Sequence, residues 1–314
     1  MYSGQRVLIT GGFGFIGSHL TKFLIEKGAN VNIICLASTD KSLLANYLEK
    51  IKIFEIDIQD TSKIEEAVLQ IQPDYVFHLA SYGVNSANQN PLLAANINII
   101  GSINLIKAIS KIHCKKFINI GTSSEYGDNL ATENNILNPV DIYGSTKAAA
   151  TLILHQLARE NDIDIITLRL FGVFGEGESP HKIFSYVILN ILKGQNVKLT
   201  KCEQIRDYIY VENVVDAIIK AGLSPLKNEV INIASGNYYP LKHYIDLIFD
   251  NMNTDKKPLY GLVEYRTSER FAPVADIKKA QDLLNFSISV PFEEGLKQTI
   301  LWYQNREKGN LWSV

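Results

Sequence analysis

The chain has 314 residues, of which 46% are hydrophobic and 20% are charged, and its formal net charge at pH 7 is −2. This length is enough for one large domain or two interleaved ones. A charge so close to neutral offers no electrostatic attraction to nucleic acid or to an anionic membrane, so we expect neither as a partner. No apolar run reads as long enough to span a bilayer, and residues 1–10 lack the apolar segment of a signal peptide, which predicts a cytoplasmic protein.

The cysteines and histidines form no recognisable metal or disulfide pattern. Cys35, Cys114 and Cys202 are odd in number and widely spaced, which suits a reducing compartment. The six histidines include no HxH or HxxxH pair. We therefore expect no structural zinc site and no other bound metal.

Short β-branched runs alternate with longer helical patterns through the first half of the chain. This rhythm predicts an α/β fold in which helices cover both faces of a parallel sheet, the Rossmann-type doubly wound arrangement. The predicted strands cover 6–10, 31–35, 52–56, 75–79, 116–120 and 164–170, and a late strand at 229–234 returns to the same sheet. The predicted helices cover 17–28, 61–71, 91–112 and 143–161.

The first predicted strand runs into "LITGGFGFIGSHL", a glycine-rich turn that opens a helix. Its glycines have both GxxGxxG and GxGxxG spacing. Glycine permits the tight turn and lets backbone N–H groups approach a pyrophosphate at the helix N-terminus. The position between a strand and a helix favours a dinucleotide site over a bare turn. The residues assigned to it are Gly11, Gly14, Phe15, Ile16 and Gly17.

The second predicted strand ends at Cys35, where NAD enzymes place an acidic residue that binds the adenosine ribose. No carboxylate stands at this position to repel a 2′-phosphate, while Ser38 and Lys41 could bind one. We therefore favour NADP(H) over NAD(H) as the cofactor. Asp40 would reverse this preference if the loop were shifted.

Two further strands end in residues that suit a ligand site, because ligands of parallel sheets bind at the carboxyl ends of the strands. Asp57, with Ile58, follows the third strand and could meet an adenine amino group; a turn that caps the next helix is an equal alternative. The row "IGTSSEYG" follows a buried-looking strand and contains Thr122, Ser123 and Ser124. These hydroxyls indicate either an ordinary turn or an active site.

Tyr143 and Lys147 stand at i and i+4 in "DIYGSTKAAATLIL", so one face of a helix carries both. A phenol is a poor base at neutral pH because its pKa is about 10. A neighbouring ammonium stabilises the phenolate and brings it into a useful range. Such a pair is common by chance, and it gains meaning from the glycine turn and the row of hydroxyls.

Together these motifs resemble the extended short-chain dehydrogenase/reductase family, and within it the nucleotide-sugar epimerase/dehydratase branch. The similarity runs over nearly the full length. "FHLAS" (77–81) resembles the cofactor-lining fourth strand of the family, and "NIIGS" (98–102) resembles its NVxGT helix. "RDYIYVENVVDA" (206–217) and "YRTSERFAPVADIKKA" (265–280) are similar to its C-terminal substrate segments.

The resemblance implies the domain layout and the roles of individual residues. It implies a NAD(P)-binding Rossmann domain at 1–170 with a return segment at about 206–236, and a smaller, interleaved nucleotide-sugar-binding domain from the rest of 171–314. Thr122 would donate to the sugar oxygen, Tyr143 would exchange a proton with the sugar, and Lys147 would tune the tyrosine. The residues assigned to the cofactor are Gly11, Gly14, Phe15, Ile16, Gly17, Ser38, Lys41, Asp57, Ile58, Leu79, Ala80, Ser81, Asn98, Tyr143 and Lys147.

On the substrate side, Arg206 and Arg266 resemble the pair that binds the diphosphate, since guanidinium forks match phosphate oxygens. The alternative is a surface salt bridge, for instance between Arg266 and Glu269. Ser123 and Ser124 are assigned to the sugar site. We expect residues near 176–205 to select the nucleotide sugar.

Three departures from the family pattern narrow the predicted activity. Ser123 and Ser124 replace the Asp–Glu pair of the dehydratases, Gly172 replaces an asparagine of the 4-epimerases, and Cys35 replaces the ribose carboxylate. We therefore predict reduction of a 4-keto-6-deoxy sugar nucleotide at C4 in the synthesis of surface-polysaccharide precursors. A 4-epimerase of a nucleotide hexose with tightly bound NAD is the alternative. A non-enzymatic dinucleotide-binding scaffold is disfavoured because the Thr, Tyr and Lys are all present.

The helices at 91–112 and 143–161 carry more apolar surface than one sheet face can cover. In relatives such helices pair across a two-fold axis into a four-helix bundle. We therefore expect a homodimer. The alternative is that both helices pack inside the thick core of a monomer.

Overall fold

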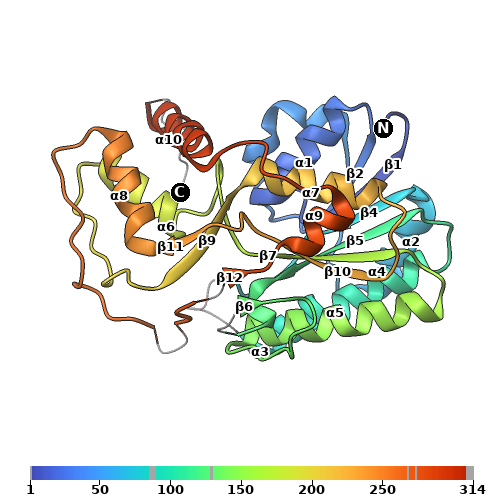
Figure 1. Cartoon of the computed structure of the whole chain (residues 1–314). Helices are drawn as coiled ribbons and strands as arrows, with labels where there is room; N and C mark the ends of the chain where they lie inside the picture. The colour runs from blue at the N-terminus through green and yellow to red at the C-terminus, as the bar shows by residue number, and fades with distance from the viewer. Residues whose placement is uncertain (1, 85–89, 128–129, 267–268, 273, 309–314) are drawn as a thin grey trace.

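The structure, a computed structural model, describes residues 2–84, 90–127, 130–266, 269–272 and 274–308. A seven-stranded sheet with the order β10-β7-β5-β4-β1-β2-β3 forms its centre, and every neighbouring pair of strands runs parallel (Figure 1). This order is the one of doubly wound dinucleotide-binding folds and confirms the predicted fold class. Its strands are β1 (Arg6–Thr10), β2 (Asn30–Cys35), β3 (Ile51–Glu55), β4 (Tyr75–His78), β5 (Lys116–Thr122), β7 (Ile165–Leu170) and β10 (Glu229–Ile233).

Helices cover both faces of this sheet because its strands are apolar on both sides. On one face lie α1 (Phe15–Glu26) and α7 (Val211–Leu223), and on the other lie α2 (Thr61–Ile71), α4 (Ser102–Ile109) and α5 (Ile142–Glu160) (Figure 1). The predicted helix at 91–112 is continuous, but its middle turn is π-helical rather than α-helical. It consists of α3 (Pro91–Ala95), the π-helical turn η3 (Asn96–Gly101) and α4. Further helical segments beside this sheet are η1 (Ser42–Lys50) and α9 (Lys278–Leu284).

The smaller part of the molecule is built around a second sheet that the sequence did not reveal. Its three strands are β8 (Gly172–Phe174), β9 (Ile205–Tyr210) and β11 (Tyr238–Pro240), in the order β11-β9-β8. The helices α6 (Ile183–Leu192), α8 (Leu241–Met252) and α10 (Phe292–Lys308) pack against it. A ribbon of β6 (Leu130–Ala131) and β12 (Val274–Ala275) joins a late segment of the chain to the region that follows β5.

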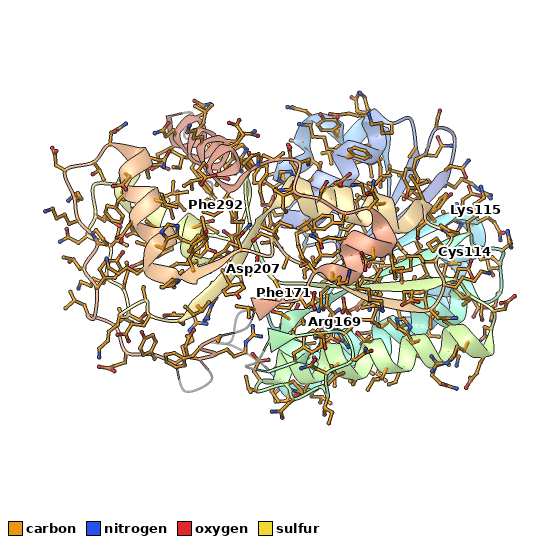
Figure 2. The ribbon with its side chains drawn as sticks, viewed as in Figure 1. Cys114, Lys115, Arg169, Phe171, Asp207 and Phe292 are labelled. Carbon is orange, nitrogen blue, oxygen red and sulfur yellow. The ribbon has the colours of Figure 1, made fainter. Side chains whose placement is uncertain are left out.

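The chain crosses between the two parts more than once. β9 belongs to the small sheet, and the chain returns to the large sheet through α7 and β10. The predicted return segment at 206–236 therefore starts inside the small sheet. Asp207 on β9 lies where the two parts meet (Figure 2) and accepts hydrogen bonds from the backbone N–H groups of Ser235, at 2.8 Å, and Gly236, at 3.0 Å. These bonds tie the turn after β10 to the small sheet, while the division of the chain into two domains stays a prediction.

One apolar run is longer than expected from the sequence, from which we predicted no run long enough to span a bilayer. Among the described residues, one helix at 91–109 is long and apolar enough by length and composition, with a mean hydropathy of 1.6. Half of it is buried inside the protein, where Ala94, Leu105 and Ile109 lie in the core. It therefore behaves as a core helix with one apolar face left uncovered.

The core of the small part depends on stacked aromatic rings. Phe174 is fully buried, and its ring centroid lies 4.7 Å from that of Phe184 in a stacked arrangement and 4.9 Å from that of Phe292. Phe174→Ala should lower the free energy of unfolding by about 3–5 kcal/mol, because a large buried side chain leaves a cavity. Urea denaturation measures this loss. Ile136→Ala, at a side chain that is 91% exposed, should change it by less than about 0.5 kcal/mol.

Candidate active site

A cavity of about 1200 Å³ lies between the carboxyl ends of the large sheet and the small part of the molecule. Both parts contribute to its wall. Of the predicted site residues, those that line it are Gly11, Gly14, Phe15, Ile16, Gly17, Asp57, Ile58, Leu79, Ala80, Ser81, Thr122, Ser123, Ser124, Tyr143, Arg206 and Arg266. The four predicted residues that stand outside its wall are Ser38, Lys41, Asn98 and Lys147.

The glycine turn between β1 and α1 is shaped by close backbone contacts. Gly11 has a φ of +72°, in the left-handed region that side chains rarely adopt. A Cβ at Gly17 would lie 2.0 Å from the carbonyl oxygen of Gly11, so the helix can approach the turn only with glycine there. Gly14 is the N-cap residue of α1 and lines the cavity. The turn thus presents a helix N-terminus to the cavity, the arrangement that binds a pyrophosphate.

The end of β2 forms the wall where an adenosine would lie. Cys35 and Thr39 line the cavity here, and burial raises the pKa of the Cys35 thiol. Lys41 forms a salt bridge with Glu55 at the end of β3, with its Nζ 3.1 Å from Oε1. Its charge is therefore already compensated within the protein. Asp57 lines the cavity and accepts the N–H of Gln59 at 2.9 Å in a local turn, while Asp60 and not Asp57 is the N-cap of α2.

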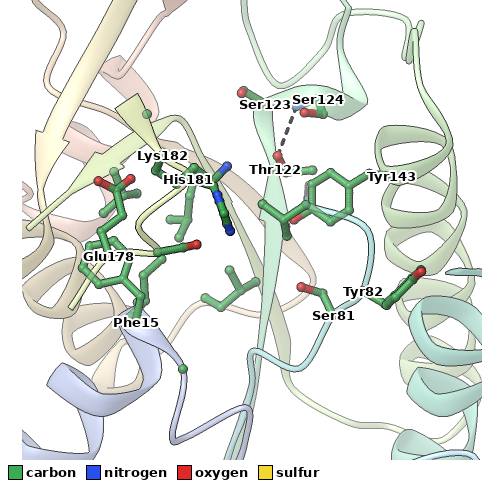
Figure 3. A pocket seen from close by; sticks show the side chains of 18 of the residues that line it. Phe15, Ser81, Tyr82, Thr122, Ser123, Ser124, Tyr143, Glu178, His181 and Lys182 are labelled. Atoms are coloured by element: carbon green, nitrogen blue, oxygen red, sulfur yellow. Dashed lines mark hydrogen bonds between the residues drawn. The ribbon is translucent and has the colours of Figure 1, made fainter. Parts of the chain in front are cut away.

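Tyr143 lies in the first turn of α5, whose N-cap Asp141 accepts the N–H of Gly144 at 2.7 Å. The side chains of Ser81 and Thr122 line the same cavity and lower the pKa of the Tyr143 hydroxyl against the larger effect of burial (Figure 3). Burial raises the pKa of Tyr143 to about 12. The phenol therefore carries its proton at neutral pH.

Lys147 stands one turn further along α5 and only 2% of it is exposed. Desolvation lowers the pKa of its ammonium to about 8, against the opposing effect of the negative charge of Glu125. It lies behind the cavity wall rather than in it. The structure thus brings the two residues of the predicted pair onto one helix face but exposes only the tyrosine.

Thr122 ends β5 and caps the short helical turn η4 (Ser123–Glu125). Its backbone N–H donates to Oε1 of Glu125 at 3.0 Å, and its Oγ1 accepts the N–H of Ser124 at 3.2 Å (Figure 3). This reciprocal pair is a capping box. The hydroxyl proton of Thr122 remains available to a ligand.

Glu125, a carboxylate that the sequence pattern did not mark as part of the site, lies directly behind Thr122. It is fully buried and forms a salt bridge with Arg169 on β7, with a distance of 2.8 Å between Oε2 and Nε. It points into the interior, so the two residues that follow Thr122 in the cavity wall are Ser123 and Ser124, which carry hydroxyls. The sequence shows an acidic residue next to these serines, but only the fold shows which way it faces.

Asn98 is a positioning residue in this structure. Its side chain accepts the N–H of Tyr82 at 2.8 Å and donates to the carbonyl of Tyr82 at 2.9 Å and to Oγ1 of Thr146 at 2.9 Å. It therefore links η3, the loop after β4 and α5. The π-helical turn places this asparagine inward, in line with the frequent use of such turns at functional sites.

The substrate end of the cavity is lined by charged side chains. Arg206 forms a salt bridge with Glu269, so the carboxylate expected beside Arg266 binds the other arginine of the predicted pair. Both arginines line the cavity. Arg270, which the sequence analysis passed over, donates to the carbonyl of Ser123 at 3.0 Å and so joins the late segment to the predicted catalytic loop. The rest of the predicted segment 265–280 is described except for residues 267–268 and 273, which lie outside the described residues.

Three titratable residues, Glu178, His181 and Lys182, reach the cavity from the segment before α6, within the range predicted to select the substrate. Glu178 is buried, and desolvation raises its pKa well above the usual range of a carboxyl. Lys182 lies close enough to interact with it electrostatically. His181 lies across the cavity from Thr122 (Figure 3). The sequence contained these residue types but gave no sign of which ones face the site.

Epimerases carry asparagine at the position of Gly172. In this protein the packing of the small sheet leaves room only for glycine there. Gly172 pairs with Tyr208 on β9, and a Cβ at this glycine would lie 2.7 Å from the carbonyl oxygen of Asp207 and 2.7 Å from the Tyr208 ring. A side chain cannot be accommodated without moving β9. The close pairing of β8 with β9 therefore explains why the asparagine of the family is absent at this position.

A parallel sheet of this strand order, with a glycine turn at its carboxyl edge, defines a dinucleotide-binding Rossmann protein. Residues 7–234 match the model of the NAD dependent epimerase/dehydratase family, and the chain belongs to that family. In the part of the chain that the structure describes, no group of three His, Cys, Asp or Glu side chains could hold a metal ion.

Known relatives are similar to the chain over nearly its whole length. The UDP-glucose 4-epimerase of Thermotoga maritima, solved with UDP-glucose, is 31% identical, with 96% of this chain and 99% of that chain covered and a TM-score of 0.89. The UDP-glucose 4-epimerase of Thermus thermophilus, solved with NAD, is 25% identical, with coverages of 95% and 99% and a TM-score of 0.87. The UDP-glucuronate 4-epimerase of Thermodesulfobacterium geofontis is 28% identical, with 94% of this chain and 95% of the relative covered. The chain thus belongs to a family of enzymes, and these relatives are 4-epimerases of nucleotide sugars.

The buried ammonium of Lys147 should cost the protein stability. Its pKa falls from 10.5 to about 8, so the native state binds fewer protons than the unfolded state between these values and stability rises with pH across this window. Lys147→Met should therefore raise the free energy of unfolding by about 2–3 kcal/mol at pH 7. The gain should be less than half as large at pH 9.5.

Urea denaturation at the two pH values measures this effect. Lys107→Met, at an exposed lysine of α4, is the matched control and should change the free energy of unfolding little at either pH. A loss of stability in Lys147→Met at pH 7 would contradict the prediction.

Proposed function

We propose that this protein reduces a 4-keto-6-deoxy sugar nucleotide at C4 with a nicotinamide cofactor. The supporting observation is that Tyr143, Thr122 and Ser81 line one cavity together with the glycine turn. A proton donor for a sugar oxygen and a site for a dinucleotide therefore share one space. Beside Thr122, the described cavity wall has hydroxyls where dehydratases have their acidic pair, which disfavours elimination of water.

The glycine turn would hold a nicotinamide cofactor, which when bound would supply the hydride for reduction at C4. The residues of the chain bind and orient the sugar and move the proton. Thr122 donates a hydrogen bond to the C4 oxygen, and Tyr143 transfers its phenolic proton to that oxygen as negative charge develops there. The ammonium of Lys147 stabilises the phenolate that remains.

Gly172 favours a reductase over an epimerase, because the packing of β9 excludes the asparagine that epimerases carry at this position. Burial raises the pKa of Tyr143 to about 12, so the phenol carries the proton that reduction of a ketone requires. The same phenol would serve an epimerase in its second half-reaction, so it does not separate the two functions.

A nucleotide-hexose 4-epimerase is the second candidate. It is favoured by the similarity to 4-epimerases from Thermotoga maritima and Thermodesulfobacterium geofontis, which are 31% and 28% identical to this chain. By the same analogy the substrate is a nucleoside-diphosphate sugar, whose diphosphate Arg206 and Arg266 would bind. Glu269 would have to release Arg206 for this purpose.

We propose NADP(H) as the preferred cofactor. The wall at the end of β2 consists of Cys35, Leu36 and Thr39, which carry no negative charge. The salt bridge of Lys41 with Glu55 weakens this preference, since a 2′-phosphate would compete with the carboxylate for the lysine. The NAD-bound relative from Thermus thermophilus favours NAD(H). We place the enzyme in the cytoplasm, which suits its three free cysteines.

The reductase and the epimerase differ in how they use the cofactor. A reductase should be purified without stoichiometric NAD and should consume added NADPH only when a 4-keto sugar nucleotide is present. Absorbance at the nicotinamide band follows this reaction. Bound NAD at full occupancy, with interconversion of sugars in the absence of added cofactor, would overturn the reductase proposal.

Tyr143→Phe is the matched control for this assay. It should lose turnover by at least about a hundredfold, the usual contribution of a general acid. It should still bind NADPH, because the ring and the rest of the cavity wall remain. Near-normal turnover in this variant would contradict the proton-transfer role of the hydroxyl.

We also propose that the protein is a homodimer through α5 and the helix at 91–109. These two helices pack side by side and expose Leu92 (71%), Leu152 (62%) and Ile100 (46%). Leu152→Glu should convert the dimer to a monomer at micromolar concentration, because a charge would be buried in the interface. Sedimentation velocity measures the change.

Leu262→Glu is the control for the dimer, since Leu262 is 60% exposed but lies outside these helices. It should leave the sedimentation coefficient unchanged. A parent protein that sediments as a monomer at micromolar concentration would rule the dimer out.

A further inference from the structure

The carboxylate of Glu125 forms the centre of a buried network directly behind the predicted catalytic threonine. Its Oε1 accepts the N–H of Thr122 at 3.0 Å and the hydroxyl of Thr151 at 3.4 Å, and its Oε2 accepts Nε of Arg169 at 2.8 Å. Gly121 leaves the space that this requires, because a Cβ there would lie 2.7 Å from Oε1. The stretch "GTSSE" therefore folds back on itself around this one carboxylate.

We propose that Glu125 is a positioning residue of the active site, which fixes Thr122 through its backbone and keeps the buried ammonium of Lys147 charged. This inference uses the roles of Thr122 and Lys147 in the proposed function. Glu125 itself does not touch the cavity, since it is fully buried and stands outside the wall. It acts through the other two residues.

The first effect is geometric. Thr122 leaves β5 with extended backbone angles, and the capping box with Glu125 fixes where the strand ends and η4 begins. Because Oγ1 of Thr122 accepts the N–H of Ser124, the hydroxyl proton can be donated to a ligand oxygen. Loss of the capping acceptor would leave the Thr122 N–H without its buried partner and release the orientation of this hydroxyl.

The second effect is electrostatic. Burial destabilises the ammonium of Lys147 and leaves its pKa at about 8, a narrow margin above neutral pH. Of the groups around it, Glu125 on η4 carries the negative charge that opposes this effect. His78 on β4 is neutral at working pH, because burial lowers its pKa to about 3, and Tyr143 on α5 is protonated. Arg169 on β7 binds the second oxygen of the same carboxylate.

The carboxylate forms a salt bridge with one cation, Arg169, and contacts Thr151, which lies one turn after Lys147 on α5. Arg169 holds the carboxylate in place through Nε, while its Nη1 donates to the hydroxyl of Tyr126 at 2.6 Å. The arginine fixes the position of the carboxylate, and the negative charge of the carboxylate raises the pKa of Lys147. An uncharged residue of the same shape at position 125 would keep the backbone contact but lose the charge.

The test uses the double variant Glu125→Gln/Arg169→Met. The glutamine can still accept the Thr122 N–H, and the variant removes both charges of the buried salt bridge together, so neither of them is left without the other and the fold is expected to survive. The protonation of Lys147 is read by NMR on protein labelled with 13C at lysine Cε. Lys147→Arg identifies the resonance by its absence.

In the parent, the Lys147 resonance should titrate with a midpoint near pH 8. In the double variant the midpoint should fall by about one pH unit, the lower end of what a nearby opposite charge contributes. The alkaline limb of kcat/KM should move with it. The NMR titration needs no turnover, so its outcome is independent of whether the protein acts on a nucleotide sugar.

Tyr126→Phe is the control for a purely structural role. It removes the hydroxyl that contacts Arg169 and that donates to Oδ1 of Asn232 at 2.8 Å, but keeps both charges of the pair. It should lower the melting temperature and leave the Lys147 midpoint unchanged. An unchanged midpoint in the folded double variant would overturn the proposal. Failure of the double variant to fold would also overturn it, because the pair would then serve the fold and not the site.

Discussion

The parallel pairing of the seven strands is the constraint on which the site depends. When all strands point the same way, the residues that follow them meet at one edge of the sheet. The glycine turn follows β1, Ser81 follows β4, and Thr122 ends β5. Segments that are more than a hundred residues apart in sequence therefore line one cavity. The small sheet, with α6, closes that cavity from the other side.

The site is held together by buried polar groups rather than by apolar packing alone. Lys147, Glu125 and Arg169 are each less than about 5% exposed, and the backbone of Thr122 and the hydroxyl of Tyr126 are bound to them. Charges in the interior are expensive unless they are paired and hydrogen-bonded. The buried charges lie beside the residues that the proposed chemistry needs as proton donors. Away from the site, around Phe174, the core consists of packed aromatic rings, which contribute to stability alone.

The sequence predicted all seven strands of the large sheet to within a few residues, because strands buried on both faces are uninterrupted β-branched and apolar runs. It missed β8 and β11, which have three residues each, and β9, whose six residues include the charged Arg206 and Asp207. Strands of three residues are too short to form a pattern, and the charged pair interrupts the apolar run of β9. Ser38 and Lys41 were assigned to the cofactor from their position after β2, and the structure places them outside the cavity wall, with Lys41 bound to Glu55.

The sequence by itself determined the fold class, the glycine turn and the pairing of Tyr143 with Lys147, since these depend on local spacing and on hydrophobic periodicity. Only the tertiary structure decided the direction of each side chain around them. It turned Glu125 inward to Arg169, bound Arg206 to Glu269 and excluded a side chain at Gly172 through the packing of β9. These outcomes depend on contacts between segments distant in the chain, where space and charge compensation decide, and no local pattern records them.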